Sequence, residues 1–469
     1  MDFRSFRNTG SISLLVLLLS ALLVIANSSV HSAASTGSDE VSAASGSNRF
    51  VVWIDYTPGN SEIFFRRSTD NGATWASIVN LSSNPGDSLE PKIAVSGSNV
   101  YVVWYQQNAA SSEDSIFFRR STDNGATWGP KIKISSSGSV GSAATPEVAG
   151  SGSNVYVVWD QQGSEIYFRR SLDNGATWKP IVNLSNNPGN SENPQLAVSG
   201  SNVYVVWYQL NAGQTASDAF FRRSTDNGAT WKLKINLSNS GSASFPEITV
   251  SSSKVHVTWS QEDPSSPPRA SVFVRSSTDG GATWKMAKNL TPSATFDSIS
   301  PRIASVGSNV YVVYEHVDPN QDCCDFTFEI VFLASTNSGG AWKPGITLRE
   351  SSSPRTEVGP LHQIVALGSK VYVSWHESVD REVVGDLHFS RSTDNGVTWT
   401  SEIREINFPI RDFQIAAFGS SVYIGYSRWT SDGPQDVFFL RSVDSGATWK
   451  SVKNLSANNG DSVGVQIGL

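Results

Sequence analysis

An eight-residue pattern, Ser-x-Asp-x-Gly-x-x-Trp, recurs along almost the whole chain and limits the folds that the chain can adopt. The tryptophans that end its eight copies lie 50 to 58 residues apart: Trp75, Trp128, Trp178, Trp231, Trp284, Trp342, Trp399 and Trp449. Only the sixth copy is degenerate, with Asn337 at the position of the aspartate. A period of this length is typical of a propeller blade rather than of a helical solenoid. The chain is therefore a repeat protein.

The fixed residues of this octapeptide suit a tight turn. The aspartate can accept hydrogen bonds from nearby backbone N–H groups, and the glycine permits a backbone angle that a side chain would forbid. The tryptophan supplies a large apolar surface that packs the turn onto a sheet. All three roles are structural, so we do not expect the octapeptide itself to be catalytic.

Four strands can be read within one period. Residues 91–95, 99–104, 115–120 and 128–134 are strand-like, and the octapeptide separates the third from the fourth. The second run is apolar on both faces, as in a sheet packed between neighbours. Four strands per period predict a propeller blade. Eight periods therefore predict an all-β fold, a single β-propeller with eight four-stranded blades.

The two ends of the repeat predict how the ring closes. A poor strand precedes the first period, which starts at residue 47, whereas the last period continues through residues 462–469. These last residues align without a gap on residues 88–95, the first strand of the next period. We expect the C-terminal strand to complete the first blade, because such a closure removes an open sheet edge.

The octapeptide resembles the Asp-box, or BNR repeat, of the sialidase-like β-propellers, and the resemblance covers nearly the whole chain beyond its N-terminal segment. It implies a turn between the third and fourth strands of each blade, on the face away from the active site. Non-enzymatic propellers carry the same box, so the resemblance implies the fold more strongly than an activity.

The first 28 residues have the layout of a secretory signal peptide. Arg4 and Arg7 precede an apolar run at residues 12–26, and small residues follow. An uncleaved anchor is the alternative, although 15 apolar residues are short for a membrane span. Residues 29–45 are rich in Ser and Ala and predict a flexible leader, and residues 46–469 form the propeller. We therefore expect a secreted or cell-surface protein.

The amino-acid composition limits the classes of molecule that we expect the protein to bind. The net charge is −7 and no basic block is present, so we do not expect nucleic acid as a partner. We expect an extracellular glycan or glycoprotein as the partner, and no stable membrane insertion after signal cleavage. The two cysteines, Cys323 and Cys324, are adjacent. They cannot form a disulfide framework for the whole fold.

One position distinguishes the last three blades from the others. It lies two residues after the aromatic residue that ends each second strand: Asp55, Gln106, Gln161, Gln209, Gln261, His316, Glu377 and Arg428. The neighbouring Glu315 and His376 are also unusual, and Trp429 is the one tryptophan of 15 outside the repeat pattern. An aromatic ring there could stack on a sugar or fold back onto its own blade. We interpret blades 6 to 8 as the candidate site; a solvated rim is the alternative.

A second position, near the start of the innermost strand, is polar in every copy. It predicts a ring of side chains at the mouth of a central channel: Lys92, Glu147, Gln195, Glu247, Arg302, Gln363, Gln414 and Gln466. Arg302 could present its guanidinium to a ligand carboxylate. It could equally pair with Glu247 in the adjacent blade.

The longest insertion, residues 318–325, is acidic. Ca²⁺ could bind near Asp318, Asp322 and Asp325 through oxygen ligands, although their spacing matches no standard calcium loop. Cys323 and Cys324 could instead form a strained vicinal disulfide. We predict no other cofactor and assign no residue as an established metal ligand.

The sialidase resemblance implies three arginines on a sugar carboxylate, a tyrosine nucleophile assisted by a glutamate, an acid/base aspartate and an Arg-Ile-Pro motif. The chain has no Arg-Ile-Pro. Arginines outside the repeat pattern that could cluster are Arg302, Arg349, Arg355, Arg411 and Arg428. The candidate nucleophile couples are Tyr314 with Glu315 and Tyr426 with Glu377. We assign catalytic candidates as Arg302, Glu315, Glu377 and Arg428, and ligand-binding candidates as His316, His376, Arg411 and Trp429.

Three functions remain open from the sequence. The first is a propeller that recognises glycans or other extracellular ligands without turnover. The second is an exo-acting glycoside hydrolase of exo-α-sialidase type with its site on blades 6 to 8. The third is a structural or adhesive surface protein. Regularity of blades 1 to 5 favours the first and third, whereas the His, Glu and Arg of blades 6 to 8 favour the second.

Overall fold

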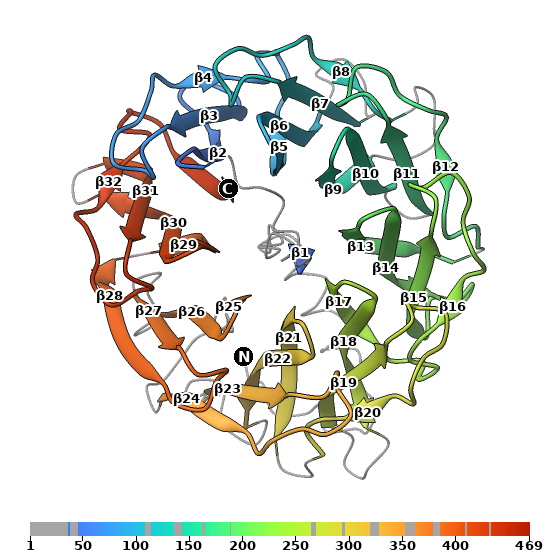
Figure 1. The fold of residues 1–469 in the computed structure, drawn as a ribbon. Coiled ribbons are helices and arrows are strands. Elements are labelled where there is room, and N and C mark those ends of the chain that lie inside the picture. Colours follow the sequence, from blue (N-terminus) through green and yellow to red (C-terminus); the bar gives the residue numbers. More distant parts are fainter. Residues whose placement is uncertain are drawn as a thin grey trace, which may run out of the picture.

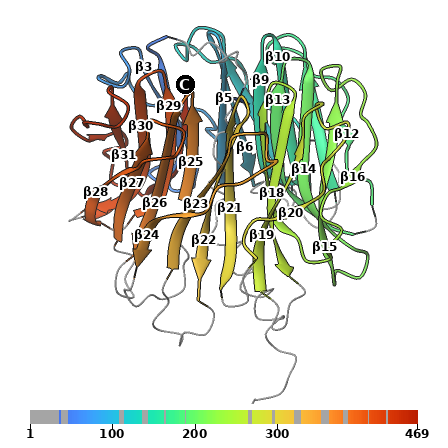
Figure 2. The same cartoon turned by 60° about the horizontal axis from the view of Figure 1, so that its bottom comes forward.

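The computed structural model is an eight-bladed β-propeller (Figure 1). It describes residues 36–37, 46–107, 114–135, 143–161, 165–187, 189–263, 269–292, 296–318, 328–351, 362–378, 385–408, 410–430 and 433–469. Within these ranges the regular elements are all strands, which run between the two faces of the ring (Figure 2). Within the same ranges, no helix is long and apolar enough to cross a membrane. The all-β prediction is confirmed.

Each blade is an antiparallel sheet whose strands follow one another from the innermost, near the axis, to the outermost. Blade 1 consists of β33 (Ser462–Gly468), β2 (Arg49–Asp55), β3 (Glu62–Ser68) and β4 (Val79–Asn80). Blade 2 consists of β5 (Ser88–Ser96), β6 (Asn99–Gln106), β7 (Ser115–Ser121) and β8 (Ile132–Lys133). Blade 3 consists of β9 (Ala143–Ser151), β10 (Asn154–Gln161), β11 (Glu165–Ser171) and β12 (Val182–Asn183). Blade 4 consists of β13 (Ser191–Ser199), β14 (Asn202–Leu210), β15 (Ser217–Ser224) and β16 (Ile235–Asn236).

The second half of the chain repeats this order. Blade 5 consists of β17 (Ser244–Ser251), β18 (Lys254–Asp263), β19 (Arg269–Ser277) and β20 (Lys288–Asn289). Blade 6 consists of β21 (Asp297–Val306), β22 (Asn309–Val317), β23 (Phe328–Ser335) and β24 (Ile346–Ser351). Blade 7 consists of β25 (His362–Leu367), β26 (Lys370–Ser378), β27 (Gly385–Ser392) and β28 (Thr400–Phe408). Blade 8 consists of β29 (Ile410–Phe418), β30 (Ser421–Thr430), β31 (Gly433–Ser442) and β32 (Lys453–Asn454).

The C-terminal strand completes the first blade, as predicted. β33 pairs antiparallel with β2, where Val51 lies opposite Ile467 and Val52 opposite Gln466. Asp412 of blade 8 also accepts hydrogen bonds from the backbone N–H groups of Gly464 (2.9 Å) and Val465 (3.0 Å). The last strand therefore joins the first blade to the last one.

Little of the N-terminal segment is described. β1 (Thr36–Gly37) pairs in parallel with the end of β17, at Val250 and Ser251, and adds a fifth strand to blade 5. The rest of residues 1–45 lies outside the described residues. The boundaries of the signal peptide and the leader therefore stay predictions.

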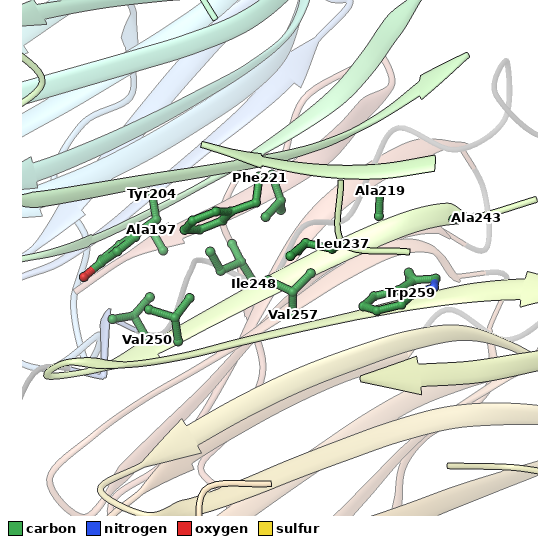
Figure 3. Close-up of a cluster of buried hydrophobic side chains, with 12 residues drawn as sticks. Ala197, Tyr204, Ala219, Phe221, Leu237, Ala243, Ile248, Val250, Val257 and Trp259 are labelled. Atoms are coloured by element: carbon green, nitrogen blue, oxygen red, sulfur yellow. The ribbon is translucent and has the colours of Figure 1, made fainter. Parts of the chain in front are cut away.

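Apolar side chains fill the spaces between neighbouring blades. One such cluster joins blades 4 and 5 and includes Phe221, Ile248, Val257 and Trp259 (Figure 3). Its members come from both blades because the inner strands are apolar on both faces. Burial of this kind stabilises the ring by about 25 cal/mol for each Å² of apolar surface removed from water.

The octapeptide closes a turn on itself and also holds the neighbouring blade. In the first copy, Asp70 accepts hydrogen bonds from the Thr74 backbone N–H (2.8 Å) and hydroxyl (2.6 Å). Trp75 packs edge-on against Phe439 of blade 8, with ring centroids 4.8 Å apart. A Cβ on Gly72 would lie 2.5 Å from the same ring, so only glycine fits there. The turn is thus a contact between blades.

The arginine pairs that precede the octapeptides also link blades. In blade 1, Arg66 donates a hydrogen bond to the carbonyl of Leu455 in blade 8 (2.8 Å), and Arg67 donates to the carbonyl of Asn124 in blade 2 (3.3 Å). Each pair therefore reaches backwards and forwards around the ring. This contact explains why the arginines recur with the repeat.

Candidate functional site

The two faces of the ring differ in what they present. The octapeptide turns join third to fourth strands and lie beside the turns that join first to second strands, since Asn124 N–H donates to the carbonyl of Ser98 (2.8 Å). The loops from second to third strands and from fourth to first strands therefore open on the opposite face. We call this opposite side the mouth face.

Most innermost strands begin at the mouth face with a β-bulge. In six of them a register shift accompanies a residue in the left-handed region: Glu90, Thr145, Asn193, Phe245, Ser300 and Gly464, with φ between 42° and 68°. We call these the bulge residues. Proline follows all of them except Gly464 and brings no N–H that would need a partner. Bulges of this kind re-aim side chains next to functional sites.

Just beyond the bulges, the polar position of the inner strands forms a belt between blades. Lys92 of blade 2 pairs with Glu147 of blade 3 at 2.9 Å, and Arg302 of blade 6 pairs with Glu247 of blade 5. Burial raises the pKa of Glu147 and of Glu247, against the opposing effect of their cationic partners. Of the two roles predicted for Arg302, the structure shows the pairing with Glu247.

Amides continue this belt where no charges are present. The Gln363 side chain donates to the carbonyl of Phe413 (3.0 Å) and accepts from the N–H of Ile415 (2.9 Å), both on the inner strand of the next blade. Gln414 in turn donates to Gln466 of blade 1 (3.2 Å). These side chains satisfy backbone groups on strand edges that face the axis.

Blade 6 places two of its candidate residues, the successive Glu315 and His316, on opposite sides of the sheet, as neighbours along a strand must be. Glu315 is 2% exposed and lies 3.3 Å from His362 of blade 7. His316 is half-buried, lies 3.3 Å from Glu329 and packs against the ring of Phe296, with centroids 4.4 Å apart. The structure therefore brings Glu315 together with a histidine that the sequence had not paired with it.

The candidates of blades 7 and 8 have separate surroundings. Arg428 is half-buried and lies over the ring of Phe438 in its own blade, 4.2 Å from the centroid. His376 on β26 and Trp429 on β30 are half-buried. The side chains of Glu377 and Arg411 lie outside the described residues, so those two assignments stay predictions.

The predicted nucleophile couples and the acidic insertion can be placed only in part. Tyr314 and Tyr426 are both buried. Asp318 follows β22, whereas Asp322, Cys323, Cys324 and Asp325 lie outside the described residues, as does Arg355. Among the residues that are described, no group of three or more His, Cys, Asp or Glu is arranged to hold a metal ion. The calcium site stays a prediction.

The structure adds a cluster on blades 2 to 4 that was not predicted from the sequence. The Tyr208 hydroxyl donates to the Glu192 carboxylate, and the Asn193 N–H donates to Asp160 (3.1 Å). Glu90 accepts from the N–H of Thr145 (3.2 Å). We call Glu90, Asp160, Glu192 and Tyr208 the acidic cluster.

Burial controls the protonation of this cluster. Burial raises the pKa of Asp160 to about 7, and the negative charges of Glu192 and Glu90 add to the effect. Burial likewise raises the pKa of the Tyr208 phenol, and the charge of Glu192 raises it further. At neutral pH, Asp160 can therefore either hold or release a proton, as a general acid or base must.

The sequence does carry a signal for this cluster. It lies one residue before the position that pointed to blades 6 to 8. The residue directly after the second-strand aromatic varies more between blades: Ile54, Tyr105, Asp160, Tyr208, Ser260, Glu315, His376 and Ser427. In blades 1 and 5, the residue two positions after the second-strand aromatic binds the indole of that aromatic. Asp55 accepts from the Trp53 indole (3.1 Å), and Gln261 accepts from that of Trp259 (2.7 Å).

Exposed apolar side chains also divide between the faces. Of the large hydrophobic residues that are exposed within the described ranges, the two aromatic ones, Tyr56 (41%) and Phe245 (37%), lie at the mouth face. The non-aromatic ones lie within the octapeptides or two to three residues after them: Ile78, Leu172, Leu233, Met286, Val397 and Val443. Exposed aromatic rings are therefore a feature of the mouth face.

Comparison with known proteins identifies no family. No family model and no curated protein matches the chain. Similar solved structures include the polysaccharide lyase Uly1, with 11% identity over 78% of this chain and 91% of that one (TM-score 0.49). They also include an ulvan lyase, with 10% identity over 79% of this chain and 93% of that one (TM-score 0.46). A third is an α-L-arabinofuranosidase of Fusarium graminearum in complex with arabinobiose, with 14% identity over 60% of this chain and 86% of that one (TM-score 0.39). These likenesses are distant and concern the fold alone.

Proposed function

We propose that this protein is an exported, Asp-box propeller of the sialidase-like type that binds glycans at its mouth face. The observation that carries the proposal is the contrast between the two faces. The octapeptide face repeats the same contacts from blade to blade, whereas the bulge residues at the mouth face change from blade to blade. Variation on a constant scaffold is typical of a binding surface.

The chemistry of the mouth face suits a sugar. A pyranose presents hydroxyl groups around its edge and C–H groups on its faces, so its site needs hydrogen-bonding groups together with an aromatic surface. The bulge residues include Glu90, Thr145, Asn193 and Ser300, which hydrogen-bond, and Phe245, which is aromatic. Secretion or display at the cell surface, proposed from the N-terminal residues, would bring this face to extracellular glycans.

A glycan array with the purified protein tests this proposal, and two asparagine variants locate the binding face. Asn193 at the mouth face and Asn124 in an octapeptide both have φ near 55° (51° and 56°), so glycine fits either site without strain. We expect Asn193→Gly to weaken glycan binding severalfold and Asn124→Gly to leave it unchanged. A protein that binds no glycan, or that is weakened only by Asn124→Gly, would contradict the proposal.

Glycoside hydrolysis is the second candidate, and the acidic cluster is the observation that favours it. The pKa of Asp160 near 7 suits a general acid, and the Tyr208–Glu192 pair suits a nucleophile with its base. This candidate places the chemistry on blades 3 and 4, whereas the sequence prediction placed it on blades 6 to 8.

Turnover of fluorogenic glycosides, a sialoside and an arabinofuranoside among them, tests this second candidate. We expect Asp160→Asn to remove the limb of the pH–rate profile near pH 7 and Tyr208→Phe to abolish turnover. Undiminished turnover in both variants would show that the acidic cluster does not catalyse the reaction. If the unmodified protein binds a glycoside but does not hydrolyse it, the hydrolase candidate is wrong and only the glycan-binding function remains.

A further inference from the structure

We propose that Phe245 is a stacking platform for the pyranose ring of an uncharged sugar. The inference rests on the proposed glycan-binding function and adds the residue and the ligand class. Phe245 lies near the start of β17, the first of the four repeat strands of blade 5, at the mouth face. The residue is 37% exposed.

The backbone at this position does not favour phenylalanine. Phe245 has φ of 50°, and a bulky side chain in this left-handed region crowds its own backbone. The equivalent bulges of the neighbouring blades hold Asn193 and Ser300, and that of blade 1 holds Gly464. The bulge therefore forms without an aromatic residue, and the ring of Phe245 is not needed to build it. Backbone strain that the fold does not require is a sign of function.

The exposure of the ring supports the same conclusion. An aromatic side chain that remains partly in water forgoes the stabilisation that its burial would give. Phe245 shares this condition with Tyr56 at the same face, whereas the exposed large hydrophobic residues of the octapeptide face are non-aromatic. The C–H face of a pyranose is a natural partner for such a flat apolar surface.

The groups around Phe245 determine the charge of the ligand. β17 lies between β13 and β21 (Figure 1), so uncharged Asn193 and Ser300 stand at the bulges on either side. Arg302 of the belt is already paired with Glu247. Arg269, at the mouth-face start of β19, faces the opposite charge of Asp297, whose pKa it lowers against the effect of burial. Glu192, directly before Asn193, adds negative charge to this side of the mouth. A sugar carboxylate or sulfate would meet repulsion at this site, whereas hydroxyl groups would find hydrogen-bond partners.

Binding of matched saccharides to the full-length protein tests the inference. The probes are neutral hexose and pentose tetrasaccharides, with uronate tetrasaccharides and sialyllactose as anionic counterparts. The variants are Phe245→Gly, which relieves the backbone; Phe245→Ser, which copies blade 6; and Phe245→Tyr, which keeps an aromatic ring. Leu233→Ala, at an 88% exposed residue beside an octapeptide, is the control for loss of surface apolarity.

We expect a neutral tetrasaccharide to bind at least tenfold more tightly than its uronate counterpart. Phe245→Gly and Phe245→Ser should each lower that affinity at least tenfold without lowering the melting temperature, whereas Phe245→Tyr and Leu233→Ala should change it less than twofold. If the unmodified protein binds a glycan and the Phe245→Gly variant binds it equally well, the proposed stacking role of Phe245 is wrong, whereas the proposed glycan-binding function stands. Tighter binding of the anionic probes would overturn the ligand class. Failure of the unmodified protein to bind any probe would overturn the proposed function and this inference with it.

Discussion

Asp160 makes the stability of the ring depend on pH in a direction opposite to that of most carboxylates. Asp160 is 5% exposed, and burial, followed by the charges of Glu192 and Glu90, raises its pKa to about 7. In the unfolded chain the same group has a pKa of about 4. Between these two values the folded state keeps a proton that the unfolded state has lost, so the free energy of unfolding falls as the pH rises.

The magnitude follows from the shift. About three pKa units at about 1.4 kcal/mol each give a destabilisation of about 4 kcal/mol that is absent below pH 4 and complete above pH 7. Asparagine cannot titrate, and its amide oxygen can still accept the hydrogen bond that Asn193 N–H donates to Asp160. Asp160→Asn should therefore gain about 4 kcal/mol relative to the unmodified protein between pH 4 and pH 8.

Urea denaturation of both proteins at pH 4, 6 and 8 measures this difference. Glu192→Gln provides a matched variant, because removing its charge lowers the pKa of Asp160 in the folded protein. The destabilisation should then still begin near pH 4, but be smaller and complete at a lower pH. A difference between Asp160→Asn and the unmodified protein that stays constant from pH 4 to pH 8 would refute the reasoning. It would mean that Asp160 is ionised throughout and solvated in the folded protein.

Three further predictions concern the ring itself. Deleting residues 462–469 should lower the melting temperature, because β2 loses its inner partner; an unchanged value would show that β33 does not close the ring. Gly125→Ala should lower the free energy of unfolding by about 2–4 kcal/mol, because its Cβ would lie 2.6 Å from the ring of Phe65, whereas Gly97→Ala, with nothing within 4 Å, should cost only about 1 kcal/mol. Hydrogen bonds from the Thr127 side chain and backbone lower the pKa of Asp123 to about 2. Denaturation of Asp123→Asn should therefore show a loss of stability at pH 7 that disappears as the pH falls from 4 to 2; a loss unchanged at pH 2 would count against it.

The fold could be predicted from the sequence because one local pattern recurs in all eight blades. The aspartate, glycine and tryptophan of the octapeptide each act within one turn and its neighbouring blade. Their roles can therefore be predicted from residue type and spacing. The closure of the ring by residues 462–469 could be predicted for the same reason, because these residues only continue the repeat. The packing of Gly72 and Trp75 against blade 8 could not be predicted from the sequence, because it joins opposite ends of the chain.

The candidate site was predicted less completely. The pairing of Arg302 with Glu247 was one of two alternatives, and spacing alone could not decide between them. The acidic cluster was missed because Glu90 and Glu192 approach Asp160 from different blades, across bulges that shift the register by a residue or more. Period-two reasoning along a single strand cannot follow such a shift. The exposed ring of Phe245 was missed because its importance depends on a backbone angle.

Hydrogen exchange of backbone amides, with and without the best-bound glycan of the array, tests the central claim most directly. The account predicts slower exchange at the mouth-face ends of β9, β13, β17 and β21, where the bulge residues lie, and no change in the octapeptide turns. Slower exchange confined to the octapeptide turns, or no change at either face with a glycan bound, would contradict the claim that the mouth face is the binding site.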